Sequence, residues 1–120
     1  MPGPVWALVT DLLFATRIVA AGNAIGAPVR IIRTTLALAA AAGTPDASGP
    51  LLLLVDLDLA GADPLEAIRM AHAGVPQLRI VAFGSHVQAE LLRAARDAGA
   101  DPVLPRSAFV ACLDELLGSA

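Results

Sequence analysis

The chain has 120 residues, of which 57% are hydrophobic and 16% are charged, and its formal net charge is −3. This length fits one domain that can bury a core without disulfide or metal staples, and the composition excludes disorder and a disulfide scaffold. All eight basic residues are arginine, so chemistry that requires a lysine amine is excluded, and the acidic balance argues against nucleic acid as a partner.

A membrane span is not expected, because the most apolar stretch is interrupted by Asp11, Arg17 and Arg30 and leaves no run of about 18 uncharged apolar residues. The single cysteine, Cys112, cannot form an internal disulfide. A reducing compartment is therefore the simplest setting. We expect a soluble, cytoplasmic protein that has no membrane contact.

Five short apolar runs have the near-continuous hydrophobicity of strands that are buried on both faces. The predicted strands are Val5–Thr10, Val29–Arg33, Leu51–Val55, Arg79–Phe83 and Pro102–Leu104.

Helical patterns alternate with these runs. The predicted helices are Leu12–Ile25, Thr35–Ala42, Pro64–Ala73, Val87–Ala98 and Ala108–Leu117. Asp63 is expected to cap the third helix, with Pro64 at its first position, and Ser107 is expected to cap the fifth.

Strict alternation of strand and helix predicts an α/β fold with a parallel sheet and right-handed crossovers. Five such units in a chain of this length favour the flavodoxin-like (βα)5 doubly wound sheet with strand order 2-1-3-4-5. No linker composition interrupts the pattern, so residues 1–120 are interpreted as a single domain.

Ligands of such sheets bind where the strands end at their carboxyl edge. Strands one and three are neighbours in this order, so Asp11 and Asp56 are expected to converge there, close to Asp58. Paired carboxylates suit Mg²⁺, which accepts one or two of them, although each aspartate is equally interpretable as a helix cap or strand end. The fourth and fifth strands contribute the following residues to the same edge: Gly84, Ser85, His86, Arg106 and Ser107.

The segment from Val55 to Glu66 resembles the strand-three region of response-regulator receiver domains, which have the CheY-like fold. The resemblance aligns Asp56 with the family's phosphoacceptor and Asp58 with the position whose backbone carbonyl binds Mg²⁺. Further along, Ala94–Asp101 is similar to the end of the family's fourth helix. The resemblance extends over essentially the whole chain.

Three of the five residues that make the family's phosphoryl switch depart from its pattern. Thr10 stands where the first of two adjacent acids is usual, before Asp11. Gly84 falls on the switch position that normally carries Thr or Ser, with Ser85 one residue further on. Arg106 replaces the lysine after strand five, and arginine is not a neutral exchange for a point-charge ammonium. The resemblance therefore implies an atypical receiver.

The resulting hypothesis is a stand-alone receiver-like signalling module of a two-component or related phosphorelay system, and not an enzyme. Asp56 is its candidate phosphoacceptor, with Mg²⁺ as the cofactor if it is phosphorylated, and its partner would be a histidine kinase or an output protein. The alternative is a pseudo-receiver that is not phosphorylated and acts by protein interaction or oligomerisation. A third possibility is a small phosphohydrolase that uses the Asp-x-Asp pair Asp56 and Asp58.

Two predicted helices carry unusually little charge. The segment Thr34–Gly43 has no charged residue, and the first helix has only Arg17 after Asp11. Because the sheet covers one face of each helix, the remaining apolar surface predicts a homodimer or a protein partner.

Overall fold

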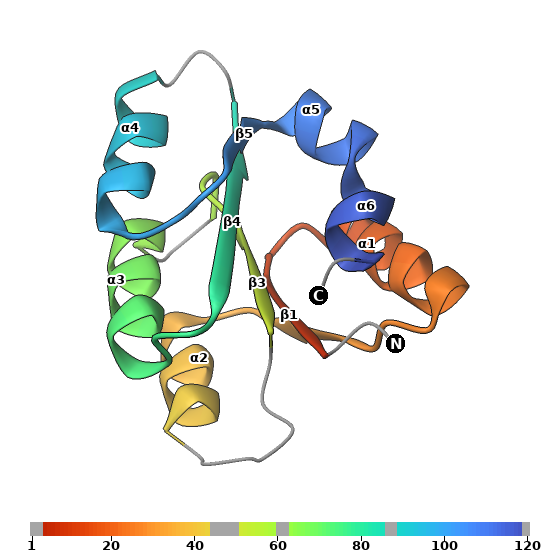
Figure 1. Cartoon of the computed structure of the whole chain (residues 1–120), viewed down its shortest axis with the longest axis horizontal. Coiled ribbons are helices and arrows are strands. Elements are labelled where there is room, and N and C mark those ends of the chain that lie inside the picture. Colours follow the sequence, from red (N-terminus) through yellow and green to blue (C-terminus); the bar gives the residue numbers. More distant parts are fainter. Residues whose placement is uncertain (1–3, 44–50, 60–62, 86–88, 119–120) are drawn as a thin grey trace.

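The computed structural model describes residues 4–43, 51–59, 63–85 and 89–118. A five-stranded parallel sheet forms its centre in the order β2-β1-β3-β4-β5, which confirms the predicted topology (Figure 1). The strands are β1 (Val5–Leu8), β2 (Val29–Ile32), β3 (Leu52–Asp56), β4 (Arg79–Gly84) and β5 (Val103–Pro105).

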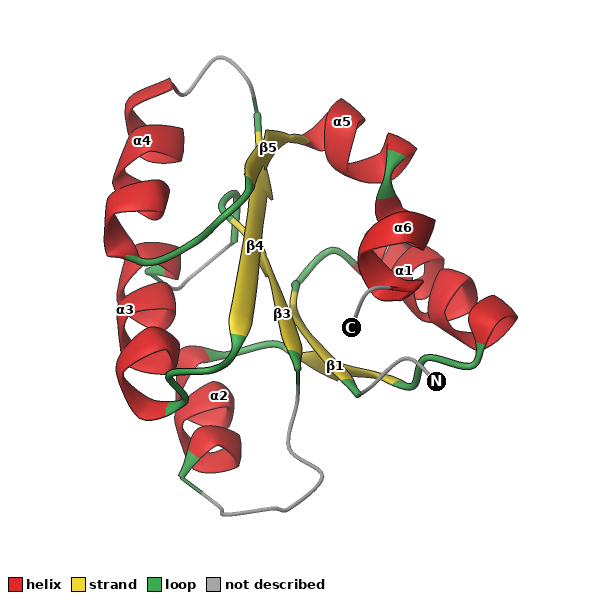
Figure 2. Cartoon of the chain, viewed as in Figure 1, coloured by secondary structure: helices red, strands yellow, loops and turns green. Residues whose placement is uncertain are grey.

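Helices cover both faces of this sheet, as Figure 2 shows. One face carries α1, α5 and α6, and the other carries α2, α3 and α4. The helices are α1 (Leu12–Ile25), α2 (Thr35–Ala42), α3 (Pro64–Gly74), α4 (Ala89–Ala98), α5 (Arg106–Ala111) and α6 (Leu113–Gly118).

Alternate residues of the strands supply two separate cores. In β3, Leu53 and Val55 face the layer of α2, α3 and α4, and Leu52 and Leu54 face the layer of α1, α5 and α6. All residues of β3 are buried. This explains why the strand reads as a continuous leucine run, because a strand covered on both faces has no solvent-facing side.

Side-chain caps fix where three helices begin. Asp11 accepts hydrogen bonds from the N–H groups of Leu13 and Phe14, and Thr34 accepts one from Ala37. Asp63 accepts from the first turn of α3, as predicted. These caps satisfy N–H groups that have no partner inside the helix.

The prediction of a fifth helix over Ala108–Leu117 is wrong in two respects. The chain forms two short helices, α5 and α6, that are separated at Cys112, and Pro105 rather than Ser107 precedes the first of them. The break has a local cause. The N–H and the thiol of Cys112 both donate to the carbonyl of Phe109, at 3.3 Å and 3.7 Å, which tightens the turn there.

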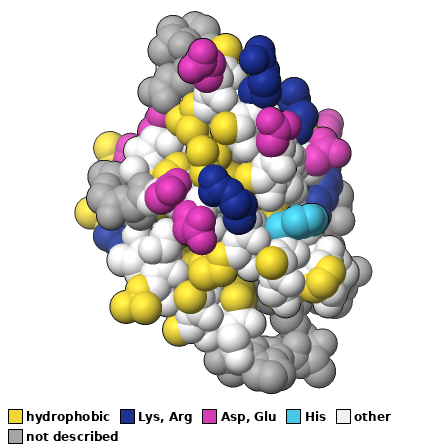
Figure 3. All heavy atoms as spheres, turned by 90° about the vertical axis from the view of Figure 1, so that its left-hand side faces the viewer, with side chains coloured by type: hydrophobic (Ala, Val, Ile, Leu, Met, Phe, Trp, Pro, Cys, Tyr) yellow, Lys and Arg dark blue, Asp and Glu magenta, His cyan; other side chains and the backbone are white. Residues whose placement is uncertain are grey.

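The face of α2, α3 and α4 is unevenly charged. Figure 3 shows acidic and basic side chains over its upper and middle parts, whereas the lower part, over α2, presents hydrophobic and neutral groups. Leu36 of α2 is 80% exposed. Within the described residues, no helix is long and apolar enough to cross a membrane.

Candidate functional site

Asp56 is the last residue of β3 and is the anchor of the candidate site. It is the buried charged residue within the described part of the chain, with only 2% of its surface exposed. The N–H of Asp58 donates to Asp56 Oδ1 at 2.9 Å, and the N–H of Leu57 donates to the Phe83 carbonyl at 2.8 Å. The second hydrogen bond holds the end of β3 against β4, and the first fixes the orientation of the Asp56 carboxylate.

Arg106 reaches this carboxylate from the start of α5. Parallel pairing of β4 with β5 places Gly84 beside Pro105, so the next residue, Arg106, begins its helix at the same sheet edge. Its Nη2 atom donates to Oδ2 of Asp56 at 3.2 Å and to Oδ1 at 3.3 Å. The same nitrogen lies 3.5 Å from Oδ2 of Asp58, so one guanidinium faces two carboxylates.

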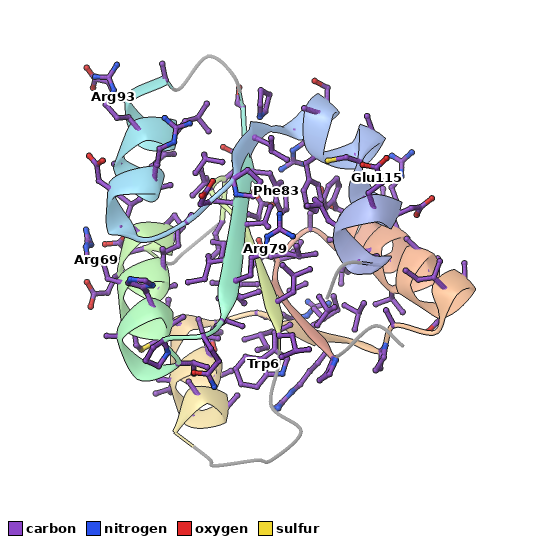
Figure 4. The ribbon with its side chains drawn as sticks, viewed as in Figure 1. Trp6, Arg69, Arg79, Phe83, Arg93 and Glu115 are labelled. Atoms are coloured by element: carbon purple, nitrogen blue, oxygen red, sulfur yellow. The ribbon has the colours of Figure 1, made fainter. Side chains whose placement is uncertain are left out.

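Phenylalanine rings lie against the other side of this guanidinium. Its central carbon is 4.7 Å from the ring centre of Phe14 in α1 and 5.9 Å from that of Phe83 in β4. Phe83 in turn stacks on Phe109 of α5 with 3.9 Å between ring centres. Figure 4 shows Phe83 in the layer between the sheet and α5. The three phenylalanines of the sequence therefore form one cluster directly below Arg106.

Two opposing effects act on the Asp56 carboxyl. Burial raises its pKa above the ordinary value, and the nearby Asp58 carboxylate acts in the same direction. The hydrogen bond from the Asp58 N–H and the charge of Arg106 lower the pKa, but burial dominates. The site therefore holds its carboxylate in an environment that disfavours charge, as binding sites often do.

Asp11 has a structural role at the same edge of the sheet. Its Oδ1 caps α1 through the N–H groups of Leu13 and Phe14, at 3.0 Å and 3.2 Å, so the cap interpretation is confirmed. A role of Asp11 in metal binding stays a prediction. The described residues contain no group of three or more His, Cys, Asp or Glu side chains placed to hold a metal ion.

The predicted switch position is occupied by buried Gly84, the last residue of β4. Leu57 packs over it, because a Cβ atom added at Gly84 would lie 3.0 Å from the Leu57 Cβ. Ser85, the other candidate, follows the strand and is half-buried. His86 lies outside the described residues.

Two contributors to this site were missed by reasoning from the sequence, Phe14 and Phe83, whereas Leu57 was expected at this edge because it follows the third predicted strand. The signals were present. Phe14 follows Asp11 by three residues, which is one helical turn, and Phe83 precedes Gly84. With so few aromatic residues in the chain, their positions beside candidate site residues were informative.

One curated protein is similar to part of the chain. The chain is 39% identical over 66 residues to the transcriptional activator protein ExaE of Pseudomonas putida. This segment is 55% of the present chain and 31% of that protein, so the match covers less than a third of the length of ExaE. No protein-family model matches the chain.

Solved structures extend the similarity to the whole fold. A CheY-like receiver domain protein from Methanospirillum hungatei is 18% identical, with all of both chains covered and a TM-score of 0.76. The receiver domain of NtrX from Brucella abortus is 17% identical over 97% of this chain and 99% of its own, with a TM-score of 0.78.

A third structure is a response regulator from Burkholderia pseudomallei with a phosphorylated aspartic acid and a calcium ion. It is 21% identical over 96% of this chain and 66% of its own, with a TM-score of 0.82. The chain therefore has the fold of CheY-like receiver domains, as the resemblance predicted.

Proposed function

We propose that this chain is a receiver module of a two-component or related phosphorelay system and that Asp56 is its phosphoacceptor. The observation that carries the proposal is the contact of Arg106 with both oxygens of the buried Asp56 carboxylate. A cation at this place neutralises charge on an incoming phosphoryl group, which is the main catalytic requirement of phosphoryl transfer. The Burkholderia protein of this fold carries a phosphorylated aspartic acid.

The proposed reaction is a displacement at phosphorus. An Asp56 carboxylate oxygen attacks the phosphorus atom of a phosphohistidine or of acetyl phosphate. A new P–O bond forms as the bond to the leaving group breaks, and the electron pair departs with histidine or acetate. Arg106 then has a phosphoryl oxygen as its partner in place of one carboxylate oxygen. Hydrolysis of the acyl phosphate by water returns Asp56 and phosphate.

A divalent cation fits the oxygen donors of this site. The carboxylates of Asp56 and Asp58 already converge on one cationic nitrogen, that of Arg106, and oxygen ligands of this kind suit Mg²⁺. The holding residues would be Asp56, Asp11 and the Asp58 backbone carbonyl. When bound, the ion would supply positive charge to the phosphoryl oxygens.

The test is incubation with acetyl phosphate, with and without Mg²⁺, followed by intact-protein mass measurement. The proposal predicts one added phosphoryl group that requires Mg²⁺ and is removed by hydroxylamine, which cleaves acyl phosphates. An unmodified protein, or an adduct that resists hydroxylamine, would contradict it.

A pseudo-receiver that signals without phosphorylation is the second candidate, and the packing of Leu57 over Gly84 favours it. A receiver switch needs a hydroxyl that follows the phosphoryl group, and this position has neither a hydroxyl nor room for one. If Mg²⁺ and acetyl phosphate leave the mass unchanged, this second function replaces the first. A phosphohydrolase that uses Asp56 and Asp58 stays a third prediction, which a generic phosphatase assay tests.

The proposed partners are a histidine kinase and an output protein, in the cytoplasm. A homodimer remains a prediction, which rests on the low charge of α1 and α2. Leu12, Leu13 and Leu36 are 61%, 86% and 80% exposed, which supports a protein contact. Light scattering across a concentration series tests the dimer, and a strict monomer would contradict it.

A further inference from the structure

Arg106 is held from two sides, although its side chain is 36% exposed. On one side its Nη2 atom faces the carboxylates of Asp56 and Asp58. On the other side the Phe14 ring lies 4.7 Å from the guanidinium carbon. An arginine has several rotatable bonds, so a half-exposed one stays in a single orientation only where contacts on both sides fix it.

We propose that Phe14 is a positioning residue for Arg106 and that its ring selects arginine over lysine at this place. The inference deepens the proposed function, because it concerns the cation beside the phosphoacceptor. A planar guanidinium stacks on an aromatic face while its edge donates hydrogen bonds to carboxylates. A lysine ammonium is a hydrated point charge with a shorter reach and gains less from the ring.

The ring itself is positioned by the rest of the site. The Phe14 N–H is capped by Asp11 at 3.2 Å, which fixes the first turn of α1. The Phe14 ring packs against Phe83 and Phe109, with ring centres 5.3 Å and 5.9 Å away. Asp11 thus acts on Arg106 through the helix start, even without a metal ion.

Nuclear magnetic resonance of the unmodified protein is the direct test, because it does not depend on phosphorylation. Protons of the Arg106 side chain that lie over a phenyl ring are shifted upfield. We expect this shift in the wild type and in Phe14→Tyr, which keeps the ring. In Phe14→Leu the shift should be clearly smaller, because only the more distant Phe83 ring remains beside the guanidinium. Leu13→Ala is the control, because this neighbouring side chain of α1 is 86% exposed, and the Arg106 shift should persist in it.

A double-mutant cycle supplies the functional readout. Phe14→Leu should slow modification by acetyl phosphate about two- to fivefold when residue 106 is arginine, the range expected of a cation–π contact. In the Arg106→Lys background the same change should alter the rate by less than about twofold.

Two results would overturn the positioning role. One is an Arg106 shift that is as large in Phe14→Leu as in the wild type. The other is an equal loss of rate in both backgrounds, which would indicate a general packing defect. If the wild type takes up no phosphoryl group, the proposed function fails, whereas the resonance shifts still decide the role of Phe14.

Discussion

The Nη2 atom of Arg106 lies 3.2 Å and 3.3 Å from the two carboxylate oxygens of Asp56. The two residues are 50 positions apart in the sequence. They meet because β3, β4 and β5 are parallel neighbours that end at one edge of the sheet. This contact joins the proposed phosphoacceptor to the cation that would stabilise its reaction.

Removal of the Arg106 guanidinium should slow phosphorylation of Asp56. Arg106→Ala is expected to lower the rate of modification by acetyl phosphate about 100-fold, the scale of one lost charge-stabilising donor at a reacting centre. Arg106→Lys should lose less, about tenfold, because charge is kept but the donor geometry changes. The rates follow from mass spectra over time. Equal rates in all three proteins would contradict the assigned role of Arg106.

Asp56→Asn should stabilise the protein at neutral pH. Burial raises the pKa of the Asp56 carboxyl in the folded state. The folded state therefore holds this proton more tightly than the unfolded state, and the unfolding free energy falls as pH rises through the folded-state pKa. Asparagine removes this loss, so we expect a gain in the free energy of unfolding at pH 7.

The gain should disappear below the ordinary carboxyl pKa of about 3.9, where Asp56 is protonated in both states. Urea unfolding of the two proteins at pH 7 and near pH 3 measures it. A gain of the same size at both pH values would indicate a cause other than the buried charge.

A threonine hydroxyl placed at Gly84 should destabilise the fold. The Cβ of Gly84→Thr would meet the Leu57 Cβ at 3.0 Å, so the variant is expected to lose about 1–3 kcal/mol, the range for over-packed cores. Ser85→Thr, at the half-buried neighbour, should stay within about 0.5 kcal/mol. Leu57→Gly, which removes the contacted Cβ, should cost less in the Gly84→Thr background than alone, and additive costs would show that the two sites do not collide.

Gly22 should be far less tolerant of alanine than Gly74. An added Cβ at Gly22 would lie 2.5 Å from the Ala27 carbonyl and 2.6 Å from a methyl carbon of Val29, whereas nothing lies within 4 Å of one at Gly74. Gly22→Ala is expected to cost about 1–3 kcal/mol, and Gly74→Ala should be neutral or slightly stabilising. Similar melting temperatures for the two variants would contradict the close approach of α1 to β2.

The order of elements was predictable from the sequence because its signals are local. Runs such as Leu51–Val55 are too short for helices, and Asp63 with Pro64 marks a helix start by side-chain chemistry alone. The strand order then follows from the rules for parallel sheets. The last helix was not predictable in detail, because no sequence signal marks Cys112, whose N–H is shared between the carbonyls of Ala108 and Phe109 where the helix breaks.

Part of the candidate site was also predictable from the sequence, and part was not. Asp56 and Arg106 could be predicted from the strand pattern. Asp56 comes directly after the third predicted strand, and Arg106 comes two residues after the fifth. The contacts of Phe14 with Arg106 and of Leu57 with Gly84 could not be predicted, because they depend on distances between side chains from different elements. Asp11 shows the remaining ambiguity, since one oxygen acts as a cap and a capping aspartate has the same sequence signature as a metal ligand.

The most direct measurement of the central claim is to locate the phosphoryl group. After treatment with acetyl phosphate and Mg²⁺, borohydride reduces an aspartyl phosphate to homoserine, and peptide mass spectrometry identifies the converted residue. The account predicts conversion at Asp56 alone and none in Asp56→Asn. Conversion at Asp11 or Asp58, or at no aspartate of a treated protein, would contradict it.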